Sequence, residues 1–162
     1  MLDIREFSNW LETGPVTDFV VHHHLLADFT AYGHYLSFFL VVGINLIVDL
    51  RILGLSPKRQ SASHLAQMLY PLMWAGLAVV FMTGFLSGAP FATLFYKSSY
   101  FLSKMTFAFL GIISTVWIRR KVREWETHPT MPAEAKIVAI ASLLLWTFTI
   151  VLATYVPKQT CT

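Results

Sequence analysis

The sequence contains four apolar runs that are long enough to cross a lipid bilayer as helices, near residues 29–50, 65–88, 101–118 and 137–156. A spanning helix needs about 20 apolar residues because the hydrocarbon core of a bilayer is about 30 Å thick. Charged residues make up 13% of the chain and the mean hydropathy is +0.59, whereas soluble domains carry about 25% charged residues. These features predict an all-α integral membrane protein, with residues 1–162 forming a single four-transmembrane-helix bundle.

Lysine and arginine residues are concentrated in two of the segments that flank these runs. Cytoplasmic loops of membrane proteins are enriched in such residues, so the distribution predicts cytoplasmic loops after the first and third runs and two periplasmic termini in a bacterial inner membrane. Because the basic residues lie beside apolar spans, they indicate topology, and a lipid bilayer rather than nucleic acid is the expected partner. The first loop contains Arg51, Lys58 and Arg59, the second contains Arg119, Arg120, Lys121, Arg123 and Lys136, and the remaining segments contain only Arg5, Lys97 and Lys158.

The first 28 residues are expected to form amphipathic helices at the membrane interface, and no signal peptide is expected. The segment "TGPVTD" predicts a break followed by a new helix with Pro15 at its first position. A frayed tail is the alternative, but a regular apolar face argues against disorder. That face consists of Leu2, Ile4, Phe7, Trp10 and Leu11, which alternate at helical spacing with Asp3, Arg5, Glu6, Asn9 and Glu12.

The first apolar run carries one polar stripe. On a helix with 100° per residue, His34, Asn45 and Asp49 lie within a sector of about 60°, with Ser37 on its flank. Polar groups are costly against lipid, so the stripe is expected to face the bundle interior. Asp49 lies near the end of the run, where it is expected to pair with Arg51 or with the bases of the following loop.

Two ionisable residues lie at similar depth from the outward face, His34 in the first run and Lys104 in the third. His34 is either an interior residue that hydrogen-bonds a neighbouring carbonyl group or a ligand for a metal ion or haem. Lys104 either extends its ammonium group toward the interface or faces an acidic group, such as a cofactor carboxylate, near His34.

Small residues recur at one side of the second and fourth runs, which predicts close helix packing and leaves room for a flat ring. The three consecutive histidines His22, His23 and His24 point about 100° apart on a helix, so an interfacial polar cluster is a better interpretation than a metal site. The small residues are Gly76, Gly84 and Gly88 with Val80 in the second run, and Ala139, Ser142, Thr149 and Ala153 beside Trp146 in the fourth.

The segments "NWLETGPVTDFV", "DLRILGL", "LYPLMWAGLAVVFMTGFLSG" and "ASLLLW" together resemble an uncharacterised family of four-span bacterial inner-membrane proteins. The resemblance covers nearly the whole chain and implies no established activity. In that family a Phe-His pair often ends the third span, whereas this chain has "VWIRR" there, which removes one candidate ligand.

More distantly, a histidine early in the first span and a lysine early in the third are similar to the pattern of the copper-resistance D membrane proteins and of the membrane-embedded protoporphyrinogen oxidase of haem synthesis. The resemblance implies that His34 is a haem b ligand and that Lys104 is essential. The expected function is therefore electron transfer near the periplasmic face by a haem b protein. Quinone is a candidate electron partner, and an enzyme with these features would be an oxidoreductase. Met82, Met105 or a histidine of residues 22–24 are candidate second ligands. A cofactor-free accessory subunit of a larger membrane complex and a copper-handling protein are the alternatives.

Overall fold

The computed structural model describes residues 3–56 and 60–156, and all regular secondary structure within these ranges is helical. The predictions that involve Leu2, Lys58, Arg59 and Lys158 concern residues outside the described ranges. The all-α prediction is confirmed. In chain order the elements are α1 (Ile4–Thr13), α2 (Pro15–His22), α3 (His24–Ile52), α4 (Ala62–Gly88), the 3-10 helix η1 (Ala89–Phe91), α5 (Ala92–Lys97), α6 (Ser99–Trp125) and α7 (Ala133–Tyr155).

The four long helices α3, α4, α6 and α7 correspond to the four predicted spans, with α7 ending one residue before its predicted end, and each is long and apolar enough to cross a bilayer. Each helix begins two to five residues before its apolar run, and in α4 and α6 a serine side chain caps the start. The side chain of Ser61 accepts a hydrogen bond from the backbone N–H of His64 at the start of α4, and Ser98 does the same for Phe101 at the start of α6. The chain is thus a multi-pass helical membrane protein.

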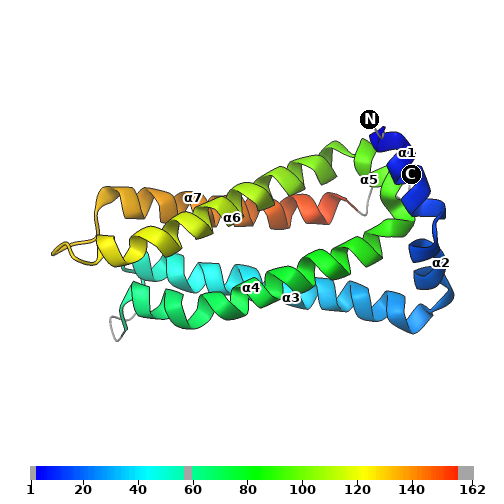
Figure 1. The fold of residues 1–162 in the computed structure, drawn as a ribbon. Coiled ribbons are helices and arrows are strands. Elements are labelled where there is room, and N and C mark those ends of the chain that lie inside the picture. Colours follow the sequence, from blue (N-terminus) through cyan, green and yellow to red (C-terminus); the bar gives the residue numbers. More distant parts are fainter. Residues whose placement is uncertain (1–2, 57–59, 157–162) are drawn as a thin grey trace.

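The four spans associate as two pairs, α3 with α4 and α6 with α7 (Figure 1). Contacts between α3 and α7 join the pairs, whereas α4 and α6 contact each other much less. Figure 1 shows α1 and α2 covering the end of the bundle where α7 also ends, while the connections from α3 to α4 and from α6 to α7 lie at the opposite end. We call these the cap end and the loop end.

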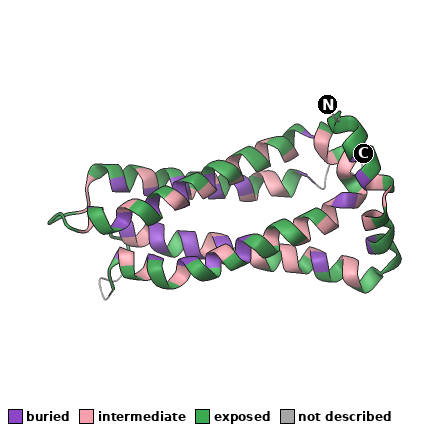
Figure 2. Ribbon diagram, viewed as in Figure 1, coloured by how far each residue is buried: buried purple, intermediate pink, exposed green. Residues whose placement is uncertain are grey.

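The apolar core lies toward the loop end (Figure 2). Elsewhere the long helices expose large apolar side chains, which suits surfaces in contact with lipid. The core is built from the second halves of α3 and α6 and the first halves of α4 and α7. Its fully buried members include Val41, Val48, Ile52, Tyr70, Met73, Ile118 and Val122.

The predicted amphipathic segment forms two short helices, α1 and α2, with Pro15 at the first position of α2 as expected. Asp3 caps α1, because its side chain accepts a hydrogen bond from the backbone N–H of Arg5. The carboxylate of Glu12 accepts hydrogen bonds from the backbone N–H and the hydroxyl of Thr93, and this ties α1 to α5. The side chain of Trp10 stays 58% exposed, in agreement with an anchor at the membrane interface.

Candidate functional site

His34 of α3 faces α4 near the cap end of the bundle. Its Nδ1 atom lies 3.0 Å from the carbonyl oxygen of Val80 and 3.5 Å from the hydroxyl of Thr83. A carbonyl oxygen can only accept a hydrogen bond, so Nδ1 is the donor to Val80. In the neutral imidazole this leaves Nε2 without a proton and with a free lone pair, which is the form of histidine that binds metals.

Gly84 makes the position of this imidazole possible. A Cβ atom at residue 84 would lie 2.8 Å from Cε1 and 3.0 Å from Nδ1 of His34, which is closer than side-chain atoms pack. The spacing of the small residues in the second run predicted close helix packing with room for a flat ring, but not the contact between Gly84 and His34. In the structure it packs against the ring of a functional candidate, so it belongs to the site.

Lys104 of α6 is the second predicted site residue, and the structure brings it near His34. The two side chains are close enough for the ammonium charge to act on the imidazole. The Nζ atom lies 5.4 Å from the ring centroid of Phe101, and Lys104 forms no ion pair with a carboxylate of residues 3–56 or 60–156. The site therefore contains a half-buried cation whose charge is uncompensated by the described side chains.

An apolar pocket of about 250 Å³ lies between α1, α4, α5 and α6 beside these residues. Gly84, which packs against His34, lines one side, and Phe101, which contacts Lys104, lines another. The remaining wall includes three aromatic side chains. The other lining residues are Leu11, Phe85, Gly88, Ala89, Ala92, Phe95, Tyr96 and Leu102.

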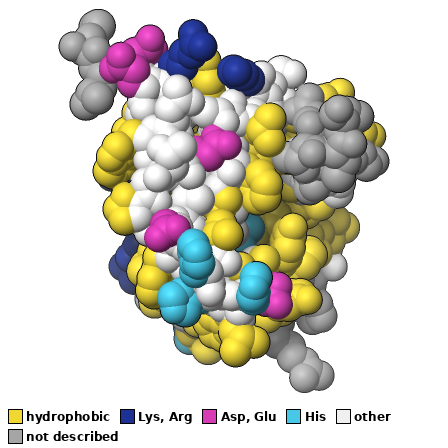
Figure 3. All heavy atoms as spheres, turned by 90° about the vertical axis from the view of Figure 1, so that its right-hand side faces the viewer, with side chains coloured by type: hydrophobic (Ala, Val, Ile, Leu, Met, Phe, Trp, Pro, Cys, Tyr) yellow, Lys and Arg dark blue, Asp and Glu magenta, His cyan; other side chains and the backbone are white. Residues whose placement is uncertain are grey.

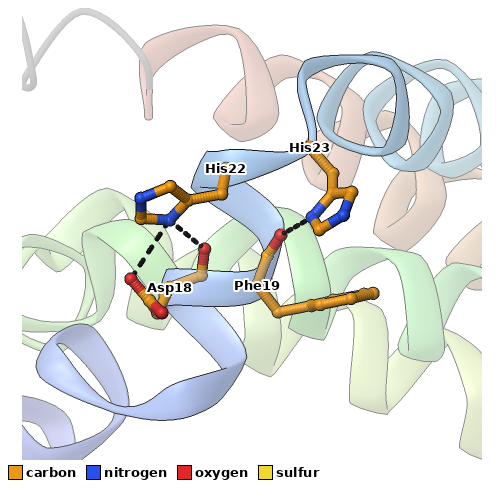
Figure 4. A network of polar contacts seen from close by, with 4 residues as sticks. All are labelled: Asp18, Phe19, His22 and His23. Atoms are coloured by element: carbon orange, nitrogen blue, oxygen red, sulfur yellow. Dashed lines mark hydrogen bonds and ion pairs between the residues drawn. The ribbon is translucent and has the colours of Figure 1, made fainter.

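The histidines at the end of α2 are engaged with their own helix (Figure 4). Nδ1 of His22 lies 2.8 Å from the carbonyl oxygen of Asp18 and 3.1 Å from its carboxylate. Nδ1 of His23 lies 2.8 Å from the carbonyl oxygen of Phe19. Histidine side chains gather on the cap-end surface, as Figure 3 shows, but within the described part of the chain no three His, Cys, Asp or Glu side chains are grouped to hold a metal ion.

The methionines considered as second ligands are directed outward to different degrees. Met82 is 67% exposed, and Met105 is 39% exposed beside Lys104. Since His34 contacts α4 at Val80, Thr83 and Gly84, Met82 lies on a different side of that helix. The geometry is that of a single histidine donor with an adjacent cation.

The remaining members of the polar stripe face the interior, as predicted. Asn45 is buried, and its amide donates to the carbonyl oxygen of Val41 at 2.8 Å. The hydroxyl of Thr115 lies 2.7 Å from Oδ1 of Asn45, and this bond links α3 to α6. Lys104 and Thr115 are eleven residues apart, so helical periodicity places both on the same side of α6.

Asp49 does not pair with Arg51, and that part of the prediction is wrong. The Arg51 guanidinium donates to the carbonyl oxygen of Gln60 at 2.6 Å, while Asp49 is fully buried. Its carboxylate lies beside Ser142 and Tyr70 without a hydrogen bond of normal geometry to a described residue. Tyr70 was not predicted as a neighbour of Asp49, because a tyrosine early in an apolar run is equally typical of an interfacial anchor or of ordinary core packing.

One known protein family matches most of the chain. The family of unknown function DUF6644 matches residues 7–156. The chain belongs to this family. The expected resemblance to an uncharacterised family is thereby confirmed. No curated protein and no solved structure matches this DUF6644 member, so the resemblance to copper-resistance D proteins and to the oxidase of haem synthesis stays a prediction.

Proposed function

We propose that this protein binds haem b through Nε2 of His34 and takes part in electron transfer near the periplasmic face of the bacterial inner membrane. The observation that carries the proposal is the hydrogen bond from Nδ1 of His34 to the Val80 carbonyl oxygen. Such a bond fixes the tautomer and the orientation of a ligating imidazole and increases its basicity.

Two further features fit the proposed group. Gly84 leaves room beside the imidazole, where any side chain would collide with it. The neighbouring pocket is apolar and aromatic, as expected for the edge of a porphyrin ring. Its volume of about 250 Å³ would enclose only part of such a ring, so the rest would contact lipid or the surfaces of α4 and α6.

Lys104 would serve as the partner of a propionate group. Its ammonium has no carboxylate partner among the described residues and lies within electrostatic range of His34. Haem supplies a one-electron couple when bound, and the protein adjusts its potential through the axial ligand, burial and nearby charge. A quinone within the membrane is the proposed electron partner because the pocket borders the lipid-facing helices.

The positive-inside distribution of Lys and Arg supports the proposed topology. The described basic residues of the loop end, which would face the cytoplasm, are Arg51, Arg119, Arg120, Lys121, Arg123 and Lys136. The cap end, where α1 begins and α7 ends, would face the periplasm (Figure 1).

The test is a reduced-minus-oxidised visible spectrum of the detergent-purified protein, with a pyridine haemochrome assay for stoichiometry. We expect a Soret band that disappears in His34→Ala and persists in His64→Ala, which removes an exposed histidine at the loop end. Lys104→Gln should keep the band and shift the midpoint potential, since it removes a nearby positive charge. A colourless protein after expression with sufficient haem would refute the proposal and favour the alternative of a cofactor-free accessory subunit. Copper bound in place of iron would favour the alternative of a copper-handling protein.

A further inference from the structure

A second pocket, of about 340 Å³, opens between α4 and α6 at the loop end, far from the His34 site. Three arginines of α6 contribute to its wall, and no carboxylate does. The complete lining consists of Ser63, Ala66, Gln67, Tyr70, Pro71, Arg119, Arg120, Val122 and Arg123. The two helices that form it are the pair with few mutual contacts, which leaves space between them.

The positive charge of this pocket is not neutralised by the described side chains. Arg119, Arg120 and Arg123 form no ion pair within residues 3–56 and 60–156. Two carboxylates near the end of α6 are engaged elsewhere: Glu124 binds Lys121 at 2.8 Å, and Glu126 accepts the backbone N–H of Ala62 at 2.5 Å. Arg119 and Arg123 are four residues apart on one helix, and like charges at that spacing repel each other.

Tyr70 forms the buried side of the pocket. Only 1% of its surface is exposed, and its hydroxyl has no hydrogen-bond partner among the described residues. Arg119 and the buried Asp49 both lie close enough to this hydroxyl to act on it electrostatically. An unpaired buried donor beside three guanidinium groups suits a ligand with several acceptor oxygens.

The surroundings of the pocket match a lipid. Exposed apolar side chains flank the pocket, Met68 and Leu72 on α4 and Trp117 on α6, and Ile113 continues this surface away from the loop end. Tryptophan is typical of the interface between head groups and acyl chains. Basic pockets between transmembrane helices on the cytoplasmic side bind the head groups of anionic lipids.

We infer that this pocket binds the phosphate of an anionic phospholipid from the leaflet at the loop end. The guanidinium groups of Arg119, Arg120 and Arg123 bind the phosphate oxygens in a planar, two-pronged geometry that an ammonium group cannot reproduce. The acyl chains then lie along the exposed apolar surfaces of α4 and α6. This inference is independent of the proposed haem site, which lies at the opposite end of the bundle.

The test uses the full-length protein in detergent and native mass spectrometry to count retained lipids. Phosphatidylglycerol and phosphatidylcholine with identical acyl chains are titrated, and inorganic phosphate is added as a competitor. Each charge near the membrane surface is worth about fivefold in affinity. We therefore expect the wild-type protein to retain a single phosphatidylglycerol in preference to phosphatidylcholine. Arg123→Gln should weaken this retention about fivefold. Lys136→Gln, at the same end of the bundle but outside the pocket, should leave it unchanged.

Two further variants separate a defined site from general attraction. Replacing all three arginines by lysine keeps the charge and should still reduce the preference for phosphatidylglycerol, because the planar geometry is lost. Gln67→Glu places a negative charge in the pocket without removing an arginine and should also reduce retention. Unchanged retention in the lysine variant would overturn the inference in favour of diffuse surface charge. Displacement of the lipid by millimolar inorganic phosphate would overturn it in favour of a soluble anion.

Discussion

The contact between Gly84 and His34 allows a quantitative test of the site by the substitution Gly84→Ala. The added Cβ would lie 2.8 Å from Cε1 of the imidazole, and ordinary van der Waals contact begins near 3.4 Å. The ring must therefore move away from α4 by about 0.6 Å. Val80 is on the same helix, so this movement lengthens the hydrogen bond from Nδ1, now 3.0 Å, beyond normal hydrogen-bonding distance.

The expected cost follows from these two effects. Forcing an extra carbon into a packed interior costs about 1–3 kcal/mol, and losing a typical hydrogen bond costs about 1 kcal/mol. Replacing glycine by alanine within a helix returns about 0.5–1 kcal/mol of backbone entropy. Gly84→Ala should therefore lower the free energy of unfolding by about 1–3 kcal/mol.

The measurement is equilibrium unfolding in mixed detergent micelles, followed by circular dichroism. Gly43→Ala is the matched control, because a Cβ at that position meets no atom within 4 Å, and it should be neutral or slightly stabilising. Histidine-selective ¹⁵N NMR reports the tautomer and should show protonated Nδ1 in wild type only. The decisive comparison is the double variant with His34→Ala, in which the penalty should vanish because the ring is gone. A penalty that persists without the imidazole would refute the reasoning.

Three further predictions concern other parts of the molecule. Thr115→Val leaves the buried amide oxygen of Asn45 without its donor and should lower the free energy of unfolding by about 1–2 kcal/mol in the same assay. The control Thr106→Val removes a hydroxyl that bonds only to its own helix and should cost much less. Equal losses in the two variants would contradict the role of the contact between Thr115 and Asn45. Glu12→Ala removes the bonds from α1 to α5 and should increase hydrogen exchange in α1 but not in α7, and unchanged exchange in α1 would count against this anchor. Asp49→Asn replaces a fully buried carboxylate that lacks normal hydrogen bonds, so the free energy of unfolding should stay equal or rise; a marked loss would show that the carboxylate has a partner.

The spans and the cap-end helices were predictable because their signals are local. A run of about 20 apolar residues has few alternatives to a membrane helix, since every backbone polar group must be satisfied within the segment. The break at Pro15 was equally readable, because proline is favoured in the first turn of a helix and Gly14 precedes it. The helix starts were less predictable, since capping by Ser61 and Ser98 extends the helices beyond the apolar residues.

The inward orientation of the polar stripe was also predictable, but its partners were not. Helical periodicity places His34, Asn45 and Asp49 on one side, and the cost of polar groups in lipid turns that side inward. Which groups meet them depends on how helices pack across long sequence separations. Asn45 meets Thr115, seventy residues away, and Asp49 meets Ser142 rather than the nearby Arg51.

Four membrane-spanning helices and an amphipathic N-terminal segment follow from the amino-acid sequence alone, because hydropathy, proline and helical periodicity act over a few turns of one helix. Three other features depend on the tertiary structure. Nδ1 of His34 donates to a carbonyl oxygen 46 residues away, and Lys104 lies within electrostatic range of the same ring. At the other end of the bundle, three arginines of α6 line a pocket with Tyr70 of α4. These pairings depend on the rotation and depth of each helix against its neighbours, and many small packing contacts between the helices set both.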